Sequence, residues 1–224
     1  MGTRPAAPAD GHARSLLKDQ AYDRIKQRLL DDDYPPGTFL SERQLAETLG
    51  MSKTPVKAAL ERLESEGFIA VSPQQGIVVR ELSVGEIADQ YEIRLALESY
   101  TVRTLAGRLG PDQAARVRAN LAAQAKLRGT GDVTRWVELD AEFHTLFAEF
   151  LANREILRVI RQLREKMRRV VTQVFRLCPA RTETSYEEHA AIAAAVLGGD
   201  GVRAAELIVR HLELGKGLIL APRA

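Results

Sequence analysis

Three histidines and one aspartate in the carboxy-terminal half have the types and spacing of a metal-binding set: Asp140, His144, His189 and His211. Asp140 lies four residues before His144, so both side chains project from one face of a predicted helix. Each histidine shares its helical face with apolar residues, which directs the imidazoles inward. Neutral imidazoles and a carboxylate are the ligands that a borderline divalent cation takes. The four residues therefore predict a metal site.

A buried histidine also has a simpler explanation, because a lone imidazole on an apolar face is more often a hydrogen-bonded core residue. For the four residues together, burial without a cation would leave several polar groups in need of partners. A catalytic alternative stays open at this point, since the same set could activate a water molecule in a metal-dependent hydrolase. Against that alternative, the sequence contains no HExxH motif, no P-loop and no evident general base.

Helical periodicity runs through the whole carboxy-terminal half and must position these residues. A capping box at Ser83 and Glu86 opens the first segment, and glycine, proline and asparagine separate the following ones. The pattern predicts helices over 83–105, 110–127, 132–151, 153–177, 185–197 and 200–220. Short connections between helices favour an antiparallel all-helical bundle.

The amino-terminal half has a different order of elements. Helices are predicted over 16–30, 41–50 and 52–67, followed by strands over 68–71 and 77–79 around a turn at 72–76. Helix, short helix, tight turn, helix and hairpin make a winged helix-turn-helix. The predicted fold class is therefore mainly α, with an N-terminal winged helix-turn-helix followed by a C-terminal antiparallel all-helical bundle. We expect a disordered tail over 1–13, a DNA-binding domain over 14–81 and an all-helical metal-binding domain over 82–224.

The second helix of a helix-turn-helix pair places its first residues at base edges in the major groove. Here these residues are two hydroxyls and two cations, with no acid among them: Ser52, Lys53, Thr54 and Lys57. Such groups reach phosphates or guanine acceptors. Arg43 is a further candidate contact, and Gln75 and Gly76 at the hairpin tip are candidates for a minor groove. The alternative interpretation is that these charges are solvated helix ends.

The overall composition excludes fewer classes of protein than the local placement of charged residues does. The 224 residues include 32 basic and 30 acidic side chains, so any nucleic-acid binding must come from locally placed charge. Aromatic residues are only 5%, which argues against a platform that stacks unpaired bases. No apolar stretch is long enough to span a membrane. A single cysteine, Cys178, suits a reducing cytoplasm, where we expect the protein.

Residues 15–81 closely resemble the GntR family of bacterial transcription regulators. The resemblance lies in Pro36–Ala46, Leu49–Leu60 and Leu63–Ile69. It implies that Arg43, Lys53, Thr54, Lys57 and the wing at Gly76 touch operator DNA. The family usually carries arginine where this chain has Lys53 and Lys57. Because lysine is a point donor that cannot fork onto guanine, base preferences do not carry over at these two positions.

Residues 83–220 resemble the FCD-type ligand-binding domain of the FadR branch of that family. The resemblance lies in Glu92–Glu98, Asp140–His144 and Glu188-His189, and it ends with Ile192, Asp200, Ala204 and His211. It implies that the four metal-type residues hold a divalent ion, zinc in preference to nickel or manganese. It also implies an organic-acid effector above the metal. Arg94 is the candidate clamp for that acid, and pairing with Glu98 one turn later is the alternative interpretation.

The combined expectation is a homodimeric regulator, a repressor by preference, that reads an inverted repeat in double-stranded operator DNA and responds to a small carboxylate. The metal-dependent hydrolase and a direct sensor of the metal are the alternatives. One further segment is notable for its charge, and a solvated face is its favoured interpretation. It comprises Arg158, Arg161, Arg164, Lys166, Arg168 and Arg169.

Overall fold

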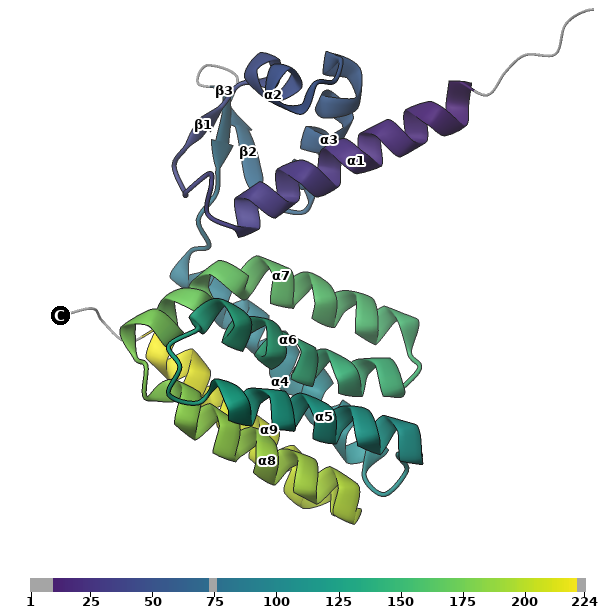
Figure 1. Ribbon diagram of the computed structural model, residues 1–224, viewed down its shortest axis with the longest axis vertical. Helices are drawn as coiled ribbons and strands as arrows, with labels where there is room; N and C mark the ends of the chain where they lie inside the picture. Colours follow the sequence, from purple (N-terminus) through teal and green to yellow (C-terminus); the bar gives the residue numbers. More distant parts are fainter. Residues whose placement is uncertain (1–9, 73–75, 221–224) are drawn as a thin grey trace, which may run out of the picture. The chain divides into compact units, whose positions relative to one another are not determined.

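A computed structural model describes residues 10–72 and 76–220 of the chain (Figure 1). The chain divides into two compact units, Met1–Leu82 and Ser83–Ala224. The first unit combines three helices with a small antiparallel sheet, and the second is a bundle of helices. This architecture confirms the predicted fold class. Within the described residues, no helix has both the length and the apolar character that crossing a membrane requires.

The amino-terminal unit contains the helix-turn-helix and its wing. Its helices are α1 (Asp10–Leu30), α2 (Glu42–Leu49) and α3 (Lys53–Ser65), and its strands are β1 (Phe39–Leu40), β2 (Ile69–Ser72) and β3 (Gly76–Val79). The sheet is antiparallel with the order β1-β3-β2. Strand β1 was not predicted, because two residues are too few to give a periodic signal. Helix α1 begins inside the segment predicted to be a tail, of which residues 1–9 lie outside the described part.

The turn between α2 and α3 has the geometry that its sequence predicts. Gly50 ends α2 in the left-handed region at φ 66°, and its backbone N–H bonds back to the last turn of the helix. Ser52 occupies the N-cap position of α3, but its side chain makes no capping hydrogen bond. A serine at this position predicts a side-chain cap, and that prediction is wrong for α3. Helix α1 packs mainly on α3 over a core that includes Ile25, Val56 and Leu63.

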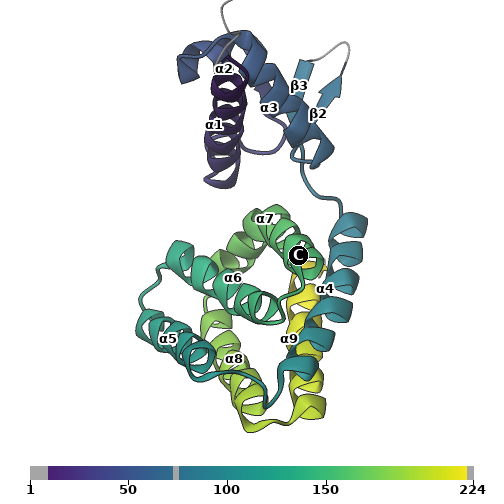
Figure 2. The ribbon, with the colours of Figure 1, turned by 90° about the vertical axis from the view of Figure 1, so that its right-hand side faces the viewer.

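Six helices form the second unit: α4 (Val84–Leu105), α5 (Pro111–Leu127), α6 (Val133–Phe150), α7 (Arg154–Leu177), α8 (Arg181–Gly198) and α9 (Gly201–Leu220). Figure 2 shows α4 and α9 side by side, and these two helices share the most extensive contact of the bundle. The capping box at Ser83 and Glu86 is present at the start of α4. Helix α8 begins at Arg181, earlier than predicted, which brings this arginine into the bundle.

The first residue of α9 packs directly on the end of α4. A Cβ at Gly201 would lie 2.7 Å from the backbone oxygen of Arg103, which is closer than real Cβ atoms come. Gly217 in the same helix has open space around the corresponding position. Of these two glycines, packing therefore requires Gly201 alone, and Gly201 sets how closely α9 approaches α4.

We predict that Gly201→Ala lowers the free energy of unfolding of the bundle by about 1–3 kcal/mol, the usual effect of overpacking. Gly217→Ala is the matched control, because the added methyl meets nothing and alanine favours a helix by up to about 1 kcal/mol. Thermal unfolding followed by circular dichroism measures both. Equal midpoints for Gly201→Ala and the wild-type chain would show that the contact is not constraining.

Candidate metal centre and DNA interface

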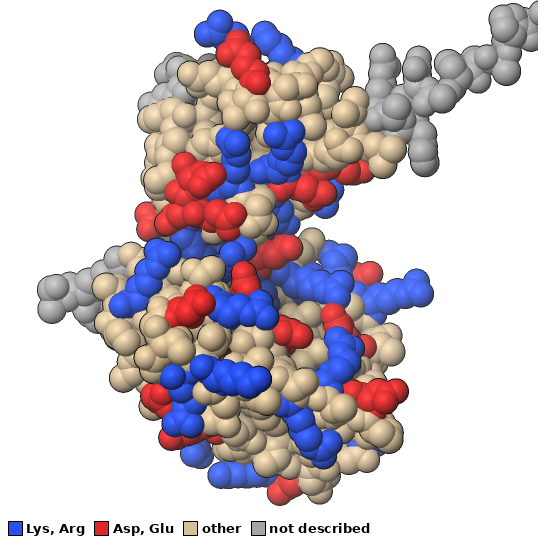
Figure 3. All heavy atoms as spheres, viewed as in Figure 1, with Lys and Arg blue, Asp and Glu red and all other residues tan. Residues whose placement is uncertain are grey.

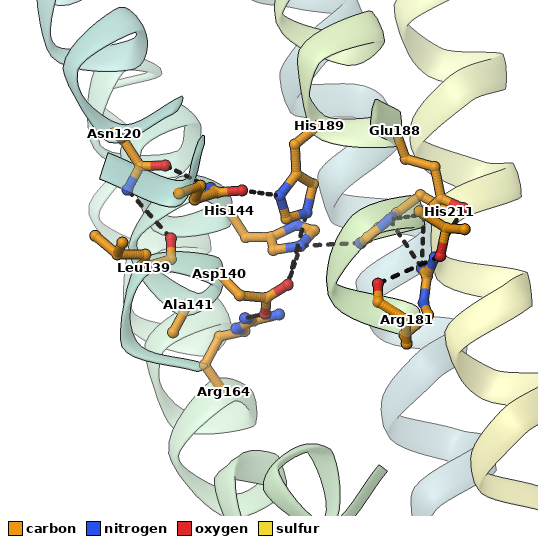
Figure 4. A network of polar contacts seen from close by, with 12 residues as sticks. Asn120, Leu139, Asp140, Ala141, His144, Arg164, Arg181, Glu188, His189 and His211 are labelled. Atoms are coloured by element: carbon orange, nitrogen blue, oxygen red, sulfur yellow. Dashed lines mark hydrogen bonds and ion pairs between the residues drawn. The ribbon is translucent and has the colours of Figure 1, made fainter. Parts of the chain in front are cut away.

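The four residues predicted to bind metal come together in the interior of the bundle (Figure 4). Asp140 and His144 lie on α6, His189 on α8 and His211 on α9, and all four are buried. One donor atom from each lies within 4.8 Å of the others. Helix α6 and the consecutive helices α8 and α9 therefore present their ligand-type atoms to one point.

The Nε2 atoms of the imidazoles face this common point. Those of His144 and His211 are 3.2 Å apart, and that of His189 lies 3.6 Å from Oδ1 of Asp140. Two nitrogens bound to one tetrahedral zinc ion at its usual bond length are about 3.3 Å apart. The spacing of these atoms thus fits a shared cation. Within the described residues, Nε2 of His189 is buried and has no hydrogen-bond partner.

Each imidazole is also oriented by a hydrogen bond at its Nδ1 atom, on the side of the ring that faces away from the cluster. Nδ1 of His144 lies 2.5 Å from Glu98, and Nδ1 of His211 lies 2.6 Å from Glu188. Nδ1 of His189 lies 2.9 Å from the amide oxygen of Gln124. Because all three partners accept, each Nδ1 carries the proton and donates it, which leaves the Nε2 lone pairs directed inward.

Gln124 is itself fixed in the orientation that this role requires. Its amide nitrogen donates to Asn120 at 2.7 Å, so its oxygen is the atom that faces His189. Asn120 in turn donates to the backbone oxygen of Leu139 on α6. Sequence reasoning missed this pair. Their signal is present, however, because Val117, Asn120 and Gln124 share one buried stripe of α5.

The electrostatic environment favours a cation. Burial lowers the pKa of His144 to about 4, although Glu98 opposes the change. Burial, with the neighbouring His211, also holds the pKa of His189 well below its usual value. Burial would raise the pKa of Asp140, but Arg164 and the imidazoles outweigh it and lower that pKa. Two neutral imidazoles and an ionised carboxylate therefore meet at neutral pH, as metal binding requires.

Arg164 is not part of a solvated face, which corrects one expectation from the sequence. Its side chain is buried and forms an ion pair with Asp140. The error has an identifiable cause: Arg164 follows Ile160 by four residues and precedes Met167 by three, so it lies on the buried stripe of α7. Arg158 on the same helix is exposed, as expected, and pairs with a glutamate.

Arg94 makes the ion pair that the alternative interpretation of the sequence predicts, and it also lines a cavity. Its Nε donates to Glu98 at 2.7 Å, so the predicted partner one turn later is present. Its Nη2 is buried and has no hydrogen-bond partner among the described residues. Arg94 also lines a cavity of about 40 Å³ beside the metal-type cluster, together with Asp140 and His211. Val171, Val174, Phe175, Leu212 and Ile219 give this cavity apolar walls.

The residues predicted to contact DNA lie at the surface of the first unit. Ser52, Lys53, Thr54 and Lys57 are exposed at the start of α3, which has no acidic residue in its first turn. Arg43 is exposed on α2, and its Nε atom lies 3.9 Å from Oε1 of Glu47. Gly76 is exposed at the start of β3, and Gln75 lies outside the described residues. Elsewhere, on the face drawn in Figure 3, basic and acidic side chains are interspersed.

A helix-turn-helix with a wing, followed in the chain by an all-helical bundle, is the architecture of a DNA-binding transcription regulator. Residues 17–79 match the model of the bacterial regulatory proteins of the gntR family, and residues 89–214 match that of the FCD domain. The second match spans more than half of the chain. The chain therefore belongs to the GntR family and carries a carboxy-terminal FCD domain.

Curated relatives are transcriptional regulators. An HTH-type regulator from the TAR-I ttuE-ttuC' intergenic region of Agrobacterium vitis is 33% identical over 127 residues, 55% of this chain and 74% of that protein. The Nta operon transcriptional regulator of Aminobacter aminovorans is 33% identical over 135 residues, 60% of this chain and 64% of its own length. The repressor RspR of Escherichia coli is 25% identical and is matched over 86% of its length and 88% of this chain.

Solved structures show the same fold. E. coli McbR/YncC superposes with a TM-score of 0.78 at 24% identity, over 91% of this chain and 96% of that one. A GntR regulator from Rhodococcus sp. RHA1 also gives a TM-score of 0.78, at 22% identity and over 92% and 99% of the two chains. At these identities the likeness concerns the fold alone.

We predict that the purified protein binds about one zinc ion per chain and that Asp140→Ala abolishes this binding. Glu98→Gln should weaken zinc binding by about 10–100-fold, because it removes the carboxylate that orients His144. Competition with a chromogenic chelator measures the affinity, and elemental analysis gives the stoichiometry.

Glu92→Gln is the matched control, since Glu92 is exposed on the same helix and should leave zinc affinity unchanged. If Asp140→Ala retains full zinc occupancy, the assignment of the ligands is wrong. If Glu98→Gln and Glu92→Gln bind zinc equally well, the orienting role of Glu98 is wrong.

Proposed function

We propose that the protein is a homodimeric transcriptional repressor whose affinity for operator DNA is set by a small organic acid bound at a divalent metal. Zinc is the preferred ion, with nickel or manganese as alternatives. The observation that carries this proposal is the convergence of three imidazole Nε2 atoms and one carboxylate beside a cavity. A cytoplasmic location belongs to the proposal, because operator DNA is the target.

Support for the metal comes from the donor set and its surroundings. Imidazole nitrogens with one carboxylate suit zinc, nickel and manganese, and the orienting partners behind each imidazole are typical of metal ligands. Without a cation, the lone pairs of His144 and His211 would face one another at 3.2 Å, and Nε2 of His189 would be buried without a partner. Both features oppose folding unless a cation compensates them.

Support for an acid effector comes from the cavity. Asp140 and His211 line it, so a ligand in the cavity lies next to the metal position. A carboxylate would complete an open coordination site there. The unpartnered Nη2 of Arg94 would donate a charge-assisted hydrogen bond to the same ligand. A metal and a guanidinium together select an anion over a neutral molecule.

Support for DNA recognition comes from the exposed start of α3. Two lysines and two hydroxyls are free to contact phosphates and base edges, and the hydroxyl of Ser52 is not used as a helix cap. Arg43 and the wing at Gly76 would add contacts on either side, and Gln75 belongs to the same proposal. Two copies related by a two-fold axis would read an inverted repeat.

The effector would act by population shift. It can change operator affinity only to the extent that it binds two arrangements of the dimer unequally. The relatives are transcriptional regulators and not enzymes, which removes the hydrolase alternative. A direct sensor of the metal remains a distinct outcome, in which chelation alone releases DNA when no acid is present.

We predict that Lys53→Ala and Lys57→Ala each weaken binding to a duplex that the wild-type protein selects from a random-sequence pool. If each lysine contacts a phosphate, the slope of log affinity against log salt should fall by about one per substitution. Fluorescence anisotropy at several salt concentrations measures both quantities.

Lys126→Ala is the control, because Lys126 is exposed on α5 in the other unit. It should change neither the affinity nor the salt slope. Unchanged values for Lys53→Ala and Lys57→Ala would remove these two residues from the interface.

We predict that millimolar acids of two to four carbons raise the melting temperature of the zinc-loaded protein but not of the chelated protein. A ligand at 100 times its Kd adds about 2.7 kcal/mol to the folded state. Arg94→Met should remove most of this shift. Arg103→Met, at an exposed arginine of the same helix, is the control that should retain it. Equal shifts with and without zinc would contradict a metal-anchored effector.

A further inference from the structure

The cavity beside the metal-type cluster has polar atoms on two different helices that find no hydrogen-bond partner in the described part of the chain. One is Nη2 of Arg94 on α4, and the other is Oγ of Ser185 on α8. Both side chains are almost wholly buried, with exposed fractions of 2% and 0%. Because buried polar atoms usually have partners, these two atoms are available to form hydrogen bonds with a ligand in the cavity. The ligand should therefore be polar at more than one point.

The charges around the cavity cancel in pairs. Arg94 bonds Glu98 at 2.7 Å, and Arg181 forms two bonds with Glu188, at 2.6 and 2.8 Å. The third cation, Arg164, pairs with Asp140, which is also the carboxylate of the metal-type cluster (Figure 4). Three guanidinium groups thus face three carboxylates. The side chains around the cavity therefore carry no net charge when the imidazoles of His144, His189 and His211 are neutral.

This balance changes the charge of the loaded site. In a site of three neutral imidazoles and one free carboxylate, a divalent cation keeps a net charge of about +1. Here Arg164 already neutralises Asp140, so the same cation would keep a charge of about +2 inside the bundle. Uncompensated charge in a buried site is strongly unfavourable. A single carboxylate would offset only half of it.

We propose that the effector is a compact dianion, specifically a small dicarboxylate, with one group toward the metal and Arg94 and the other toward Ser185 and Arg181. This inference rests on the proposed metal-anchored function and adds the charge of the ligand to it. The cavity volume of about 40 Å³ is room for about three water molecules, which restricts the ligand to a short chain. Its apolar walls at Val171 and Leu212 suit the carbons between the two groups.

The test compares acids that have equal carbon chains but different charge. Full-length, zinc-loaded protein is titrated with malonate, propionate and inorganic phosphate by isothermal calorimetry at neutral pH. Elemental analysis after each titration checks that the zinc is retained. Malonate should bind at least about tenfold more tightly than propionate, because one more buried negative charge lies near the cation. It should also bind more tightly than phosphate, which has no carbon atoms to contact the apolar walls of the cavity.

Substitutions test the origin of this preference. Arg164→Gln removes one positive charge and should reduce the ratio of malonate to propionate affinity by about tenfold, whereas Arg164→Lys should retain it. Arg161→Gln is the matched control, because Arg161 is a half-exposed arginine on α7 that pairs with Glu149. Ser185→Ala should weaken malonate binding about tenfold, since a hydrogen bond to a charged group is lost. It should change propionate affinity little.

The outcomes separate the two levels of inference. If propionate binds the wild-type protein as tightly as malonate, the dianion proposal is overturned while the metal-anchored acid survives. Tighter binding of phosphate would also overturn the dicarboxylate. If neither acid binds the zinc-loaded protein, both proposals fail. The comparison of acids on the wild-type protein decides the matter even if Arg164→Gln does not fold, and Ser185→Ala then provides the second test.

Discussion

The bundle depends on three hydrogen bonds that hold imidazole rings from behind. Glu98, Gln124 and Glu188 each accept from an Nδ1 atom, and each comes from a helix that must be in place for the contact to form. The consequence is that the buried Nε2 lone pairs converge, which costs free energy unless a cation is shared among them. The contacts that join α4 to α6, α5 to α8 and α8 to α9 therefore also position the donor atoms of the proposed metal site.

Arg164 determines the net charge of the metal-type cluster. By pairing with Asp140, it lowers the pKa of that carboxylate and keeps it ionised, but it also uses the negative charge that would otherwise balance a metal. One buried arginine on α7 thus connects the chemistry of the metal-type cluster to the charge of whatever enters the cavity. We propose that a bound anion neutralises the remaining positive charge of the metal-loaded bundle. Binding of the anion would then favour one arrangement of the bundle over another, and this preference could alter the affinity for DNA.

Much of the architecture could be predicted because periodic patterns and caps are local signals. The helix-turn-helix with its glycine turn, the capping box at Ser83 and the grouping of Asp140 with three histidines all follow from spacing. What could not be predicted are contacts between helices. Glu98 was recognised only as a partner of Arg94, because its bond to His144 joins residues 46 positions apart. Strand β1 and the start of α8 were missed because tertiary contacts define them, with little contribution from propensity.

The most direct measurement is a crystal structure of zinc-loaded, full-length protein with anomalous diffraction data at the zinc edge. We predict one strong peak per chain, within bonding distance of Nε2 of His144, His189 and His211 and of a carboxylate oxygen of Asp140, with Glu98 still hydrogen-bonded to Nδ1 of His144. A bundle interior without a peak, in which the imidazoles bond only one another and the protein, would contradict this prediction.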